Sequence, residues 1–411
     1  METEKLLSVE NALLRVLLGV TPPGASHMLA LEHCFGRRLS ADLAALRTQP
    51  PVAVSAMDGY AVQSGDVVKI PARLAIVGES AAGCGFAGRV GPGQAVRIFT
   101  GAPVPEGADA VLVQERALAE GTQVIAQDSV PRGRNIRVAG LDFNTGDVLL
   151  RAGRRLGATE LALAAAMNHA SLPVARQPRV AILATGDELV RPGEIPGPGQ
   201  IVASNSFAIA AYVTAAGGVP VDLGIAGDSL EALESGIARA QTESADILVT
   251  LGGASVGDHD LVKSALARQG MELDFWRIAM RPGKPLIFGR LGEMRILGLP
   301  GNPVSSIVCA ILFLSPLIRA LSGDRHPDAD PTEPAVLAVD VGGNDMRQDY
   351  LRSALTPSSD RAALVTPFGR QDSSMLRILA DAECLLVRAP HAPPAKAGSP
   401  CRIIRLDHGM R

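Results

Sequence analysis

The chain has 411 residues, of which 47% are hydrophobic and 20% are charged, and its formal net charge is −3. This length exceeds what one hydrophobic core usually serves, so we expect about two to four globular domains. The near balance of charge and the aromatic content of 3% argue against a nucleic-acid surface, which needs a basic excess and rings that stack on bases.

The cysteines and the apolar runs exclude further classes of protein. The five cysteines are scattered, with no C-x-x-C pair and no histidine at metal-ligand spacing, so neither a zinc site nor a disulfide framework is expected. The N-terminus opens acidic and lacks the basic and then apolar order of a secretory signal. The longest apolar run, Ile307–Ile318, is shorter than the ~20 residues of a membrane helix, and we expect a buried core helix there. These features predict a cytoplasmic protein that binds no membrane.

The secondary structure that the sequence predicts changes twice in the first part of the chain. Apolar residues at helical spacing predict an opening helix over 8–18, with Ser8 as its N-cap. Brief β-rich runs divided by Gly and Pro turns predict an all-β insert domain over 47–137. Helical periodicity returns over 159–167, and the segment 173–178 is expected to be a linker.

Strand and helix signals alternate over 178–325. Such alternation predicts βαβ units, and hence a doubly wound, mostly parallel α/β sheet domain with helices on both faces. Expected strands lie at 180–183, 219–225, 247–249, 275–279, 286–288 and 295–297, and expected helices at 205–216, 229–242, 261–268 and 306–321. A polar stretch, 324–334, is expected to be a linker, and the short apolar runs of 326–411 predict a C-terminal β-domain that resembles a barrel.

Three glycine-rich loops follow apolar runs and are expected at the ends of strands. They are 251–258, 281–285 and 298–305. In an open α/β sheet, ligands bind beyond the carboxyl ends of the strands. Glycine lets the backbone approach a phosphate or oxyanion closely, and Arg281 and Lys284 supply positive charge. The loops therefore predict a polyanionic ligand.

Acidic residues follow three successive predicted strands. They are Asp187 or Glu188, Asp228 and Asp258. Carboxylates gathered in one crevice are suited to a Mg²⁺ ion that bridges phosphate oxygens. The alternative is that Asp187 and Asp228 cap helices, since Asp is a favoured N-cap residue.

Other enzyme motifs are missing from the sequence. It has no G-x-x-x-x-G-K-[ST], no G-x-S-x-G and no spaced Cys/His pair, which argues against P-loop ATPases, hydrolases and proteases. Asp58, Thr100 and Asp142 stand in ordinary turn sequences, for which a structural role is the more frequent one.

Six motifs in order closely resemble the MoeA family of molybdopterin molybdenumtransferases, which is related to the C-terminal region of gephyrin. They lie at 55–61, 98–105, 185–189, 252–258, 281–285 and 298–305. The resemblance spans the whole chain. It implies a homodimer whose discontinuous first domain, 1–46 and 138–177, carries the β insert.

The family resemblance implies the reaction and its substrates. Members take adenylylated molybdopterin and molybdate, cleave the phosphoanhydride with Mg²⁺, release AMP and insert the metal. Matching motif positions imply that Glu188, Asp228 and Asp258 hold the Mg²⁺ ion or assist the cleavage. The residues implied to bind substrate or molybdate are Gly252, Gly253, Ser255, Arg281, Lys284, Pro300, Ser305, Arg352 and Ser373.

The resemblance also implies a site shared between subunits. Asp58, Thr100 and Asp142 match further catalytic positions, and the first two would come from the partner subunit's insert domain. Three residues depart from the family pattern: Arg281 stands where Lys is frequent, Ala254 where valine is usual, and Asp372 where glycine is favoured.

Two alternative functions remain open at this point. A molybdopterin adenylyltransferase shares the α/β domain and its glycine-rich loop, and such an enzyme is also a candidate partner. A binding or scaffold protein similar to gephyrin is the alternative outside enzymes.

Overall fold

The computed structural model describes residues 6–22, 24, 26–253, 261–357 and 363–406. The chain forms two compact units. The first comprises Met1–His27, Gly36–Ser40 and Val174–Arg411, and the second comprises Met28–Phe35 and Ala41–Pro173.

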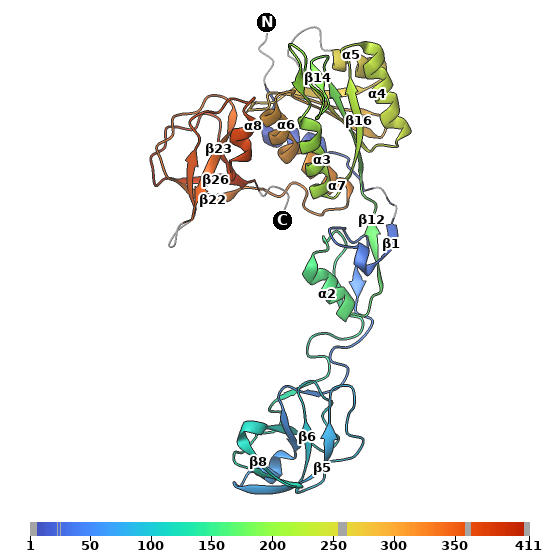
Figure 1. The fold of residues 1–411 in the computed structure, drawn as a ribbon, viewed down its shortest axis with the longest axis vertical. Helices are drawn as coiled ribbons and strands as arrows, with labels where there is room; N and C mark the ends of the chain where they lie inside the picture. The colour runs from blue at the N-terminus through green and yellow to red at the C-terminus, as the bar shows by residue number, and fades with distance from the viewer. Residues whose placement is uncertain (1–5, 23, 25, 254–260, 358–362, 407–411) are drawn as a thin grey trace. The chain divides into compact units, whose positions relative to one another are not determined.

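A six-stranded sheet forms the centre of the first unit (Figure 1). Its order is β16 (Val219–Ala226), β13 (Arg179–Thr185), β17 (Ile247–Leu251), β21 (Met294–Leu299), β20 (Pro285–Leu291) and β18 (Glu272–Arg277). The first four strands are parallel, whereas β20 and β18 each run antiparallel to their preceding neighbour. The prediction of a mostly parallel sheet is confirmed.

Helices cover both faces of this sheet, as the prediction of a doubly wound domain requires. One face packs against a core that includes residues of α1 (Val9–Leu17), α3 (Asn205–Ala216), α6 (Pro303–Cys309) and α7 (Ser315–Leu321). The other packs against α4 (Leu230–Thr242) and α5 (Leu261–Arg268). Every residue of β17 and β21 is buried, because a parallel sheet covered on both faces has no solvent side.

The apolar run near residue 310 is a core helix, as predicted. It is longer than the run itself, since α6, the π-helical turn η4 (Ala310–Leu314) and α7 join into one 19-residue helix, Pro303–Leu321. Its length and composition would suit a membrane span, but 78% of its apolar window is buried inside the protein.

The C-terminal strands of the first unit close into a barrel. They are β22 (Glu333–Leu337), β23 (Gln348–Thr356), β24 (Leu364–Pro367), β25 (Cys384–Arg388) and β26 (Pro400–Arg405). The sheet order β23-β24-β22-β26-β25 returns to β23 through a further pairing, which confirms the barrel-like prediction. The short strand β19 (Met280–Arg281) pairs with β23 and joins the barrel to the α/β domain. The helix α8 spans Leu376–Ala380. The predicted linker 324–334 was wrong at its end, because Glu333 and Pro334 pair with β26.

The second unit contains the predicted all-β insert. Its six-stranded sheet has the order β7 (Ala110–Val113), β4 (Gly59–Val62), β6 (Gln94–Ile98), β5 (Ala72–Ser80), β9 (Gln123–Ala126) and β8 (Ala117–Glu120). Outside this sheet, the chain forms the helix α2 (Ala158–Ala166) and three strand pairs, β3 (Val54–Ser55) with β10 (Ile136–Arg137), β2 (Leu43–Ala44) with β11 (Val148–Leu150), and β1 (Ser26–Ala30) with β12 (Ser171–Ala175). The predicted linker 173–178 was wrong at its start, since Pro173–Ala175 belong to β12. The division into four domains at the expected boundaries stays a prediction.

Candidate functional site

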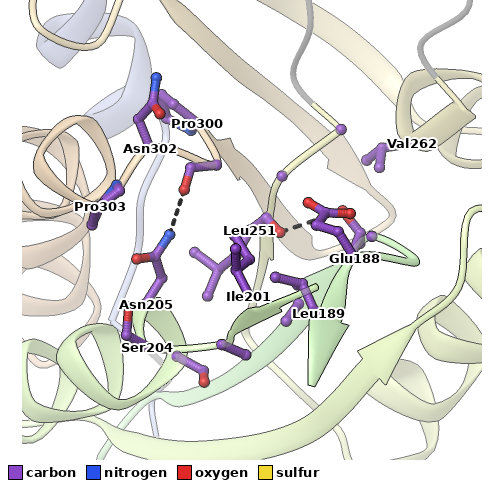
Figure 2. Close-up of a pocket in the computed structure, with 18 of the residues that line it drawn as sticks. Glu188, Leu189, Ile201, Ser204, Asn205, Leu251, Val262, Pro300, Asn302 and Pro303 are labelled. Atoms are coloured by element: carbon purple, nitrogen blue, oxygen red, sulfur yellow. Dashed lines mark hydrogen bonds between the residues drawn. The ribbon is translucent and has the colours of Figure 1, made fainter. Parts of the chain in front are cut away.

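A cavity of about 870 Å³ lies at the carboxyl ends of β13, β17 and β21 (Figure 2). Its walls are the loops that follow these strands, the start of α3, and the short strands β14 (Leu189–Val190) and β15 (Ile201–Val202). This is the edge at which the sequence predicts ligand binding.

The loop after β13 brings a carboxylate to the cavity. Glu188 lines it, and its side chain lies over Gly186, where a Cβ atom would stand 2.3 Å from Glu188 Oε2. Gly186 has φ +142°, a conformation that side chains rarely adopt. The glycine therefore provides both the turn and the space that the carboxylate occupies.

The structure separates the roles of the two neighbouring acids. Asp187 Oδ1 accepts a hydrogen bond of 3.0 Å from the backbone N–H of Asp228, so this carboxylate is a local cap. Among the residues that the structure describes, Glu188 and Asp228 are the acids that line the cavity. Asp228 does not cap the following helix, because the N-cap of α4 is Ser229, whose Oγ accepts from the N–H of Ala232.

The glycines after β17 are required by their surroundings. Gly252 has φ +103°, and a Cβ there would lie 2.7 Å from the carbonyl oxygen of Thr185. Gly253 has φ +66°, and a Cβ there would lie 2.2 Å from Val262 Cγ2. Both line the cavity, and a larger residue at either position would have to displace a wall. Ser255 and Asp258 of the same loop lie outside the described residues.

The loop after β21 packs against this glycine loop. A Cβ at Gly301 would lie 3.6 Å from Gly252 Cα, so the two backbones approach closely. Asn205, at the start of α3, donates from Nδ2 to the Gly301 carbonyl oxygen at 2.7 Å (Figure 2). Pro300, a predicted site residue, lines the cavity beside Gly301.

The two predicted cations on the turn 281–285 point to different places. Lys284 lines the cavity and makes no ion pair with a described residue. Arg281 is not among the lining residues. Its guanidinium forms ion pairs with Asp345 and Asp349 and a hydrogen bond to Asn344 Oδ1 at 3.3 Å.

Two further predicted anion ligands, Ser305 and Arg352, are buried and are not among the residues that line the cavity. Ser305 is buried in α6, and Arg352 is 1% exposed in β23. Arg352 donates to Gln371 Oε1 at 3.2 Å and to the Asp372 carbonyl oxygen at 2.7 Å. Burial lowers the pKa of this guanidinium, while the charge of Asp372 raises it. Arg352 thus holds the loop that carries Ser373.

The neighbour of Ser373 reaches the cavity. Ser374 lines it, whereas the carbonyl oxygen of Ser373 accepts a hydrogen bond of 3.2 Å from the N–H of Val304. Asp372 Oδ1 accepts from the hydroxyl and the N–H of Ser374, at 2.7 and 2.8 Å, and these bonds lower the pKa of Asp372. The carboxylate that departs from the family pattern therefore caps the loop and orients Ser374.

Sequence reasoning missed three kinds of lining residue. An Asn at a helix start is usually taken as a cap, which hid the role of Asn205 in holding Gly301. Ser374 lies one residue from the motif position. The third kind is an apolar wall, formed by Leu189, Ile201 and Val202, whose short strands give no clear periodicity.

Three predicted site residues lie in the second unit. Asp58 and Thr100 are brought together, since Asp58 Oδ1 accepts from the N–H of Thr100 at 2.7 Å and from its hydroxyl at 2.8 Å. The backbone bond, then the hydroxyl bond and the charge of Arg97, lower the pKa of Asp58. Asp142 lies in an exposed turn and donates from its backbone N–H to the Gln49 carbonyl oxygen at 3.0 Å.

Glycine loops and charged side chains at the ends of parallel strands define an α/β protein whose cavity is suited to an anionic ligand. Sequence profiles give the family: the MoeA N-terminal region (domain I and II) matches residues 7–168, a probable molybdopterin binding domain matches 181–320, and the MoeA C-terminal region (domain IV) matches 334–406. The chain belongs to the MoeA family of molybdopterin molybdenumtransferases, which are enzymes of molybdenum cofactor biosynthesis.

Relatives match over nearly the whole chain. The molybdopterin molybdenumtransferase of Haemophilus influenzae is 32% identical over 404 residues, which cover 98% of this chain and 99% of the relative. That of Bacillus subtilis is 34% identical over 372 residues, covering 89% and 86%. A crystal structure of the molybdopterin biosynthesis MoeA protein of Pyrococcus horikoshii has a TM-score of 0.83 at 26% identity, covering 97% of this chain and 99% of that one.

Proposed function

We propose that the protein inserts molybdate into adenylylated molybdopterin, with Mg²⁺-dependent cleavage of the phosphoanhydride and release of AMP. The observation that carries this proposal is the cavity itself. Glu188, Asp228 and Lys284 face it, and Gly252 and Gly253 line it. Such a set suits a ligand that carries phosphates and a metal ion, because carboxylates hold the metal while cationic and backbone donors hold the anion.

The acids fit a Mg²⁺ ion by their chemistry. Mg²⁺ prefers oxygen ligands and keeps several of its waters, so one or two protein carboxylates suffice. Glu188 and Asp228 supply them, and Asp258 is proposed as a third. Within the described ranges, no group of three His, Cys, Asp or Glu residues that could hold a metal ion is present. Bound there, Mg²⁺ would neutralise charge on the phosphates.

The other lining groups orient the substrate. Lys284 offers an ammonium group to the oxyanion, and a charge-assisted hydrogen bond compensates the water that the anion loses on entry. Gly252 and Gly253 allow the backbone to approach the phosphates closely. Ile201 and Val202 also line the cavity, and their exposed side chains fit the flat face of a ring system.

The proposal includes residues and partners for which the support is the family resemblance. Ser305, Arg352 and Ser373 are proposed to shape the anion subsite, with Ser255 beside them. Asp58, Thr100 and Asp142 are proposed as further catalytic residues, the first two contributed by the partner subunit of a homodimer. A cytoplasmic location and a separate molybdopterin adenylyltransferase as partner complete the proposal.

Two alternative functions, adenylyl transfer and a scaffold role, account for less of this chain. Both an adenylyltransferase and a scaffold would leave part of the molecule without a role. Matches to the MoeA N- and C-terminal regions flank the α/β domain and favour the molybdenum-inserting step. A scaffold has no need of Glu188, Asp228 and Lys284 in one cavity.

The direct test is AMP release from adenylyl-molybdopterin by the purified protein with Mg²⁺, with and without molybdate. We expect molybdate to stimulate the release. Release of no AMP from intact substrate would contradict the proposal, and formation of adenylyl-molybdopterin from ATP and molybdopterin would show an adenylyltransferase instead.

A further inference from the structure

We propose that Arg281 is a positioning residue: it fastens the turn 281–285 to the β-barrel and thereby sets Lys284 in the cavity, and it does not bind the anion itself. This inference rests on the proposed molybdate insertion. It assigns different tasks to two cations that stand three residues apart on one turn.

Three acceptors hold the Arg281 guanidinium. Nη1 lies 3.3 Å from Asp345 Oδ2, and Nη2 donates to Asn344 Oδ1 at 3.3 Å and to Asp349 Oδ2. Because a guanidinium is a planar fork of N–H donors, several acceptors fix its orientation. We call Asn344, Asp345 and Asp349 the barrel socket.

The socket is itself rigidly built. Asn344 Nδ2 donates to the carbonyl oxygens of Arg347, Arg388 and Ala389 at 2.7, 3.1 and 2.9 Å, which turns its Oδ1 toward Arg281. Asp345 is held by the Arg347 side chain at 2.7 Å. Arg347, with Arg281 beside it, keeps the pKa of Asp345 well below its usual range, so Asp345 stays ionised.

Asp349 depends on Arg281. Its side chain is 5% exposed, and its Oδ1 has no hydrogen-bond partner within the described part of the chain. Loss of Arg281 would leave a buried carboxylate without its ion pair, which is strongly unfavourable. The pair also continues a backbone contact, since β19 and β23 align Arg281 with Asp349.

The turn transmits this attachment to Lys284. Gly283 has φ +108°, and a Cβ there would lie 2.7 Å from Cys309 Sγ and 2.9 Å from Met280 Cε, so the backbone is wedged against α6. The carbonyl oxygen of Lys284 accepts a hydrogen bond of 3.0 Å from the N–H of Ile278. A shift of Arg281 therefore moves the segment that presents Lys284.

The test is a set of variants assayed for molybdate-dependent AMP release, with kcat and the KM for molybdate measured separately. Arg281→Met and Asp349→Asn should each raise the KM for molybdate by about tenfold or more, because either change removes the ion pair between Arg281 and Asp349. The double variant should be no worse than either single variant. In a Lys284→Met background, Arg281→Met should add no further loss.

The inference is wrong if the variants show that Arg281 contacts the anion. If Arg281 binds the anion itself, Asp349→Asn will free it and lower the KM for molybdate, while Arg281→Met raises it and adds to Lys284→Met. Either finding overturns the inference. Should Arg281→Met fail to fold, Arg281→Lys keeps the charge but lacks the fork, and it should also raise the KM.

A matched control removes an ion pair elsewhere in the barrel. Arg405→Met breaks the contact of Arg405 Nε with Glu333 Oε1 at 2.5 Å, and we expect an unchanged KM for molybdate. An equal rise would show general loosening of the barrel and overturn the inference. Wild-type protein that releases no AMP would overturn the proposed function and this inference together, whereas an active wild type with the opposite variant responses contradicts the inference alone.

Discussion

The charged groups of the cavity and those of the insert turn at Asp58 are held in different ways. In the cavity, Glu188, Asp228 and Lys284 form no side-chain hydrogen bond or ion pair with other described residues. At the insert turn, Asp58 accepts two hydrogen bonds from Thr100. The first group keeps its charges available, whereas the second satisfies a charge within the protein.

This difference separates binding groups from groups that fix a loop. The three cavity side chains are exposed and carry their charge without a partner among the described residues, so together they suit a ligand that brings phosphates and a metal ion. A carboxylate that accepts an N–H and a hydroxyl from one residue instead joins two segments of chain. The barrel socket around Arg281 belongs to the second kind, although Arg281 shares its turn with Lys284.

Lys284→Met gives the largest effect that this comparison predicts. We expect kcat/KM for molybdate to fall by about 100-fold or more, because a desolvated oxyanion loses its cationic donor. Stability should not change, since the side chain is exposed. Lys396→Met, which removes an exposed lysine paired with Asp340, is the control and should keep full activity. Equal activity of both variants would mean that Lys284 does not face the ligand.

Glu188→Gln and Asp228→Asn test the acidic half of the cavity. We expect each to raise the Mg²⁺ concentration needed for half-maximal AMP release and to lower the rate by about 100-fold, since a neutral amide is a poor Mg²⁺ ligand. The matched control is Asp187→Asn, which keeps an oxygen acceptor for the N–H of Asp228. If Asp187→Asn has the larger effect, the assignment of Glu188 as the cavity acid is wrong.

Most of the fold was predictable because its signals are local. The alternation of apolar strands and amphipathic helices over 178–325 gave the α/β domain, and Gly and Pro turns marked the insert. The longest strand of the barrel, β23, escaped prediction because its sequence is QDYLRSALT, in which Asp349, Arg352 and Ser353 are buried. Asp349 and Arg352 are buried there because their partners, Arg281 and Gln371, come from other segments of the chain, which no local pattern contains.

The site was predictable as far as loops at strand ends allow. Gly252, Gly253, Glu188, Asp228, Lys284 and Pro300 all line the cavity, as strand ends of a parallel sheet should. The direction of the Arg281 side chain was not predictable, because it depends on Asp345 and Asp349, more than 60 residues later in the chain. Asn205 was missed for the same reason, since its partner is Gly301.

Gly252→Ala tests whether the backbone of the cavity loop needs a glycine beside Thr185. The new Cβ would combine an unfavourable φ of +103° with a 2.7 Å contact to the Thr185 carbonyl oxygen, and we expect a local loss of stability of about 3 kcal/mol. Native-state hydrogen exchange of the β13 and β17 amides measures it. Gly292→Ala is the control: it has φ +60° with no atom within 4 Å, so strain alone should cost about 1 kcal/mol. Equal losses would show that the close approach to Thr185 adds nothing.

Thr100→Val gives the smallest predicted effect. It tests whether the Thr100 hydroxyl holds the Asp58 carboxylate at the insert turn. The hydroxyl of Thr100 stabilises ionised Asp58, so the pKa of Asp58 lies below its ordinary value. Valine removes the hydroxyl but keeps the N–H, and the pKa should rise part of the way back. A lowered carboxyl pKa stabilises the fold above the unfolded pKa, and this effect is lost as the pH falls through the folded pKa. The variant should therefore be less stable than wild type above the acid range and equally stable below it. The ¹³C shift of the Asp58 carboxyl as a function of pH measures the change, with Thr100→Ser as the control that retains the bond. A pKa of Asp58 that is the same in all three proteins would show that the Thr100 hydroxyl does not hold this carboxylate, and the insert turn would then resemble the cavity more than the socket.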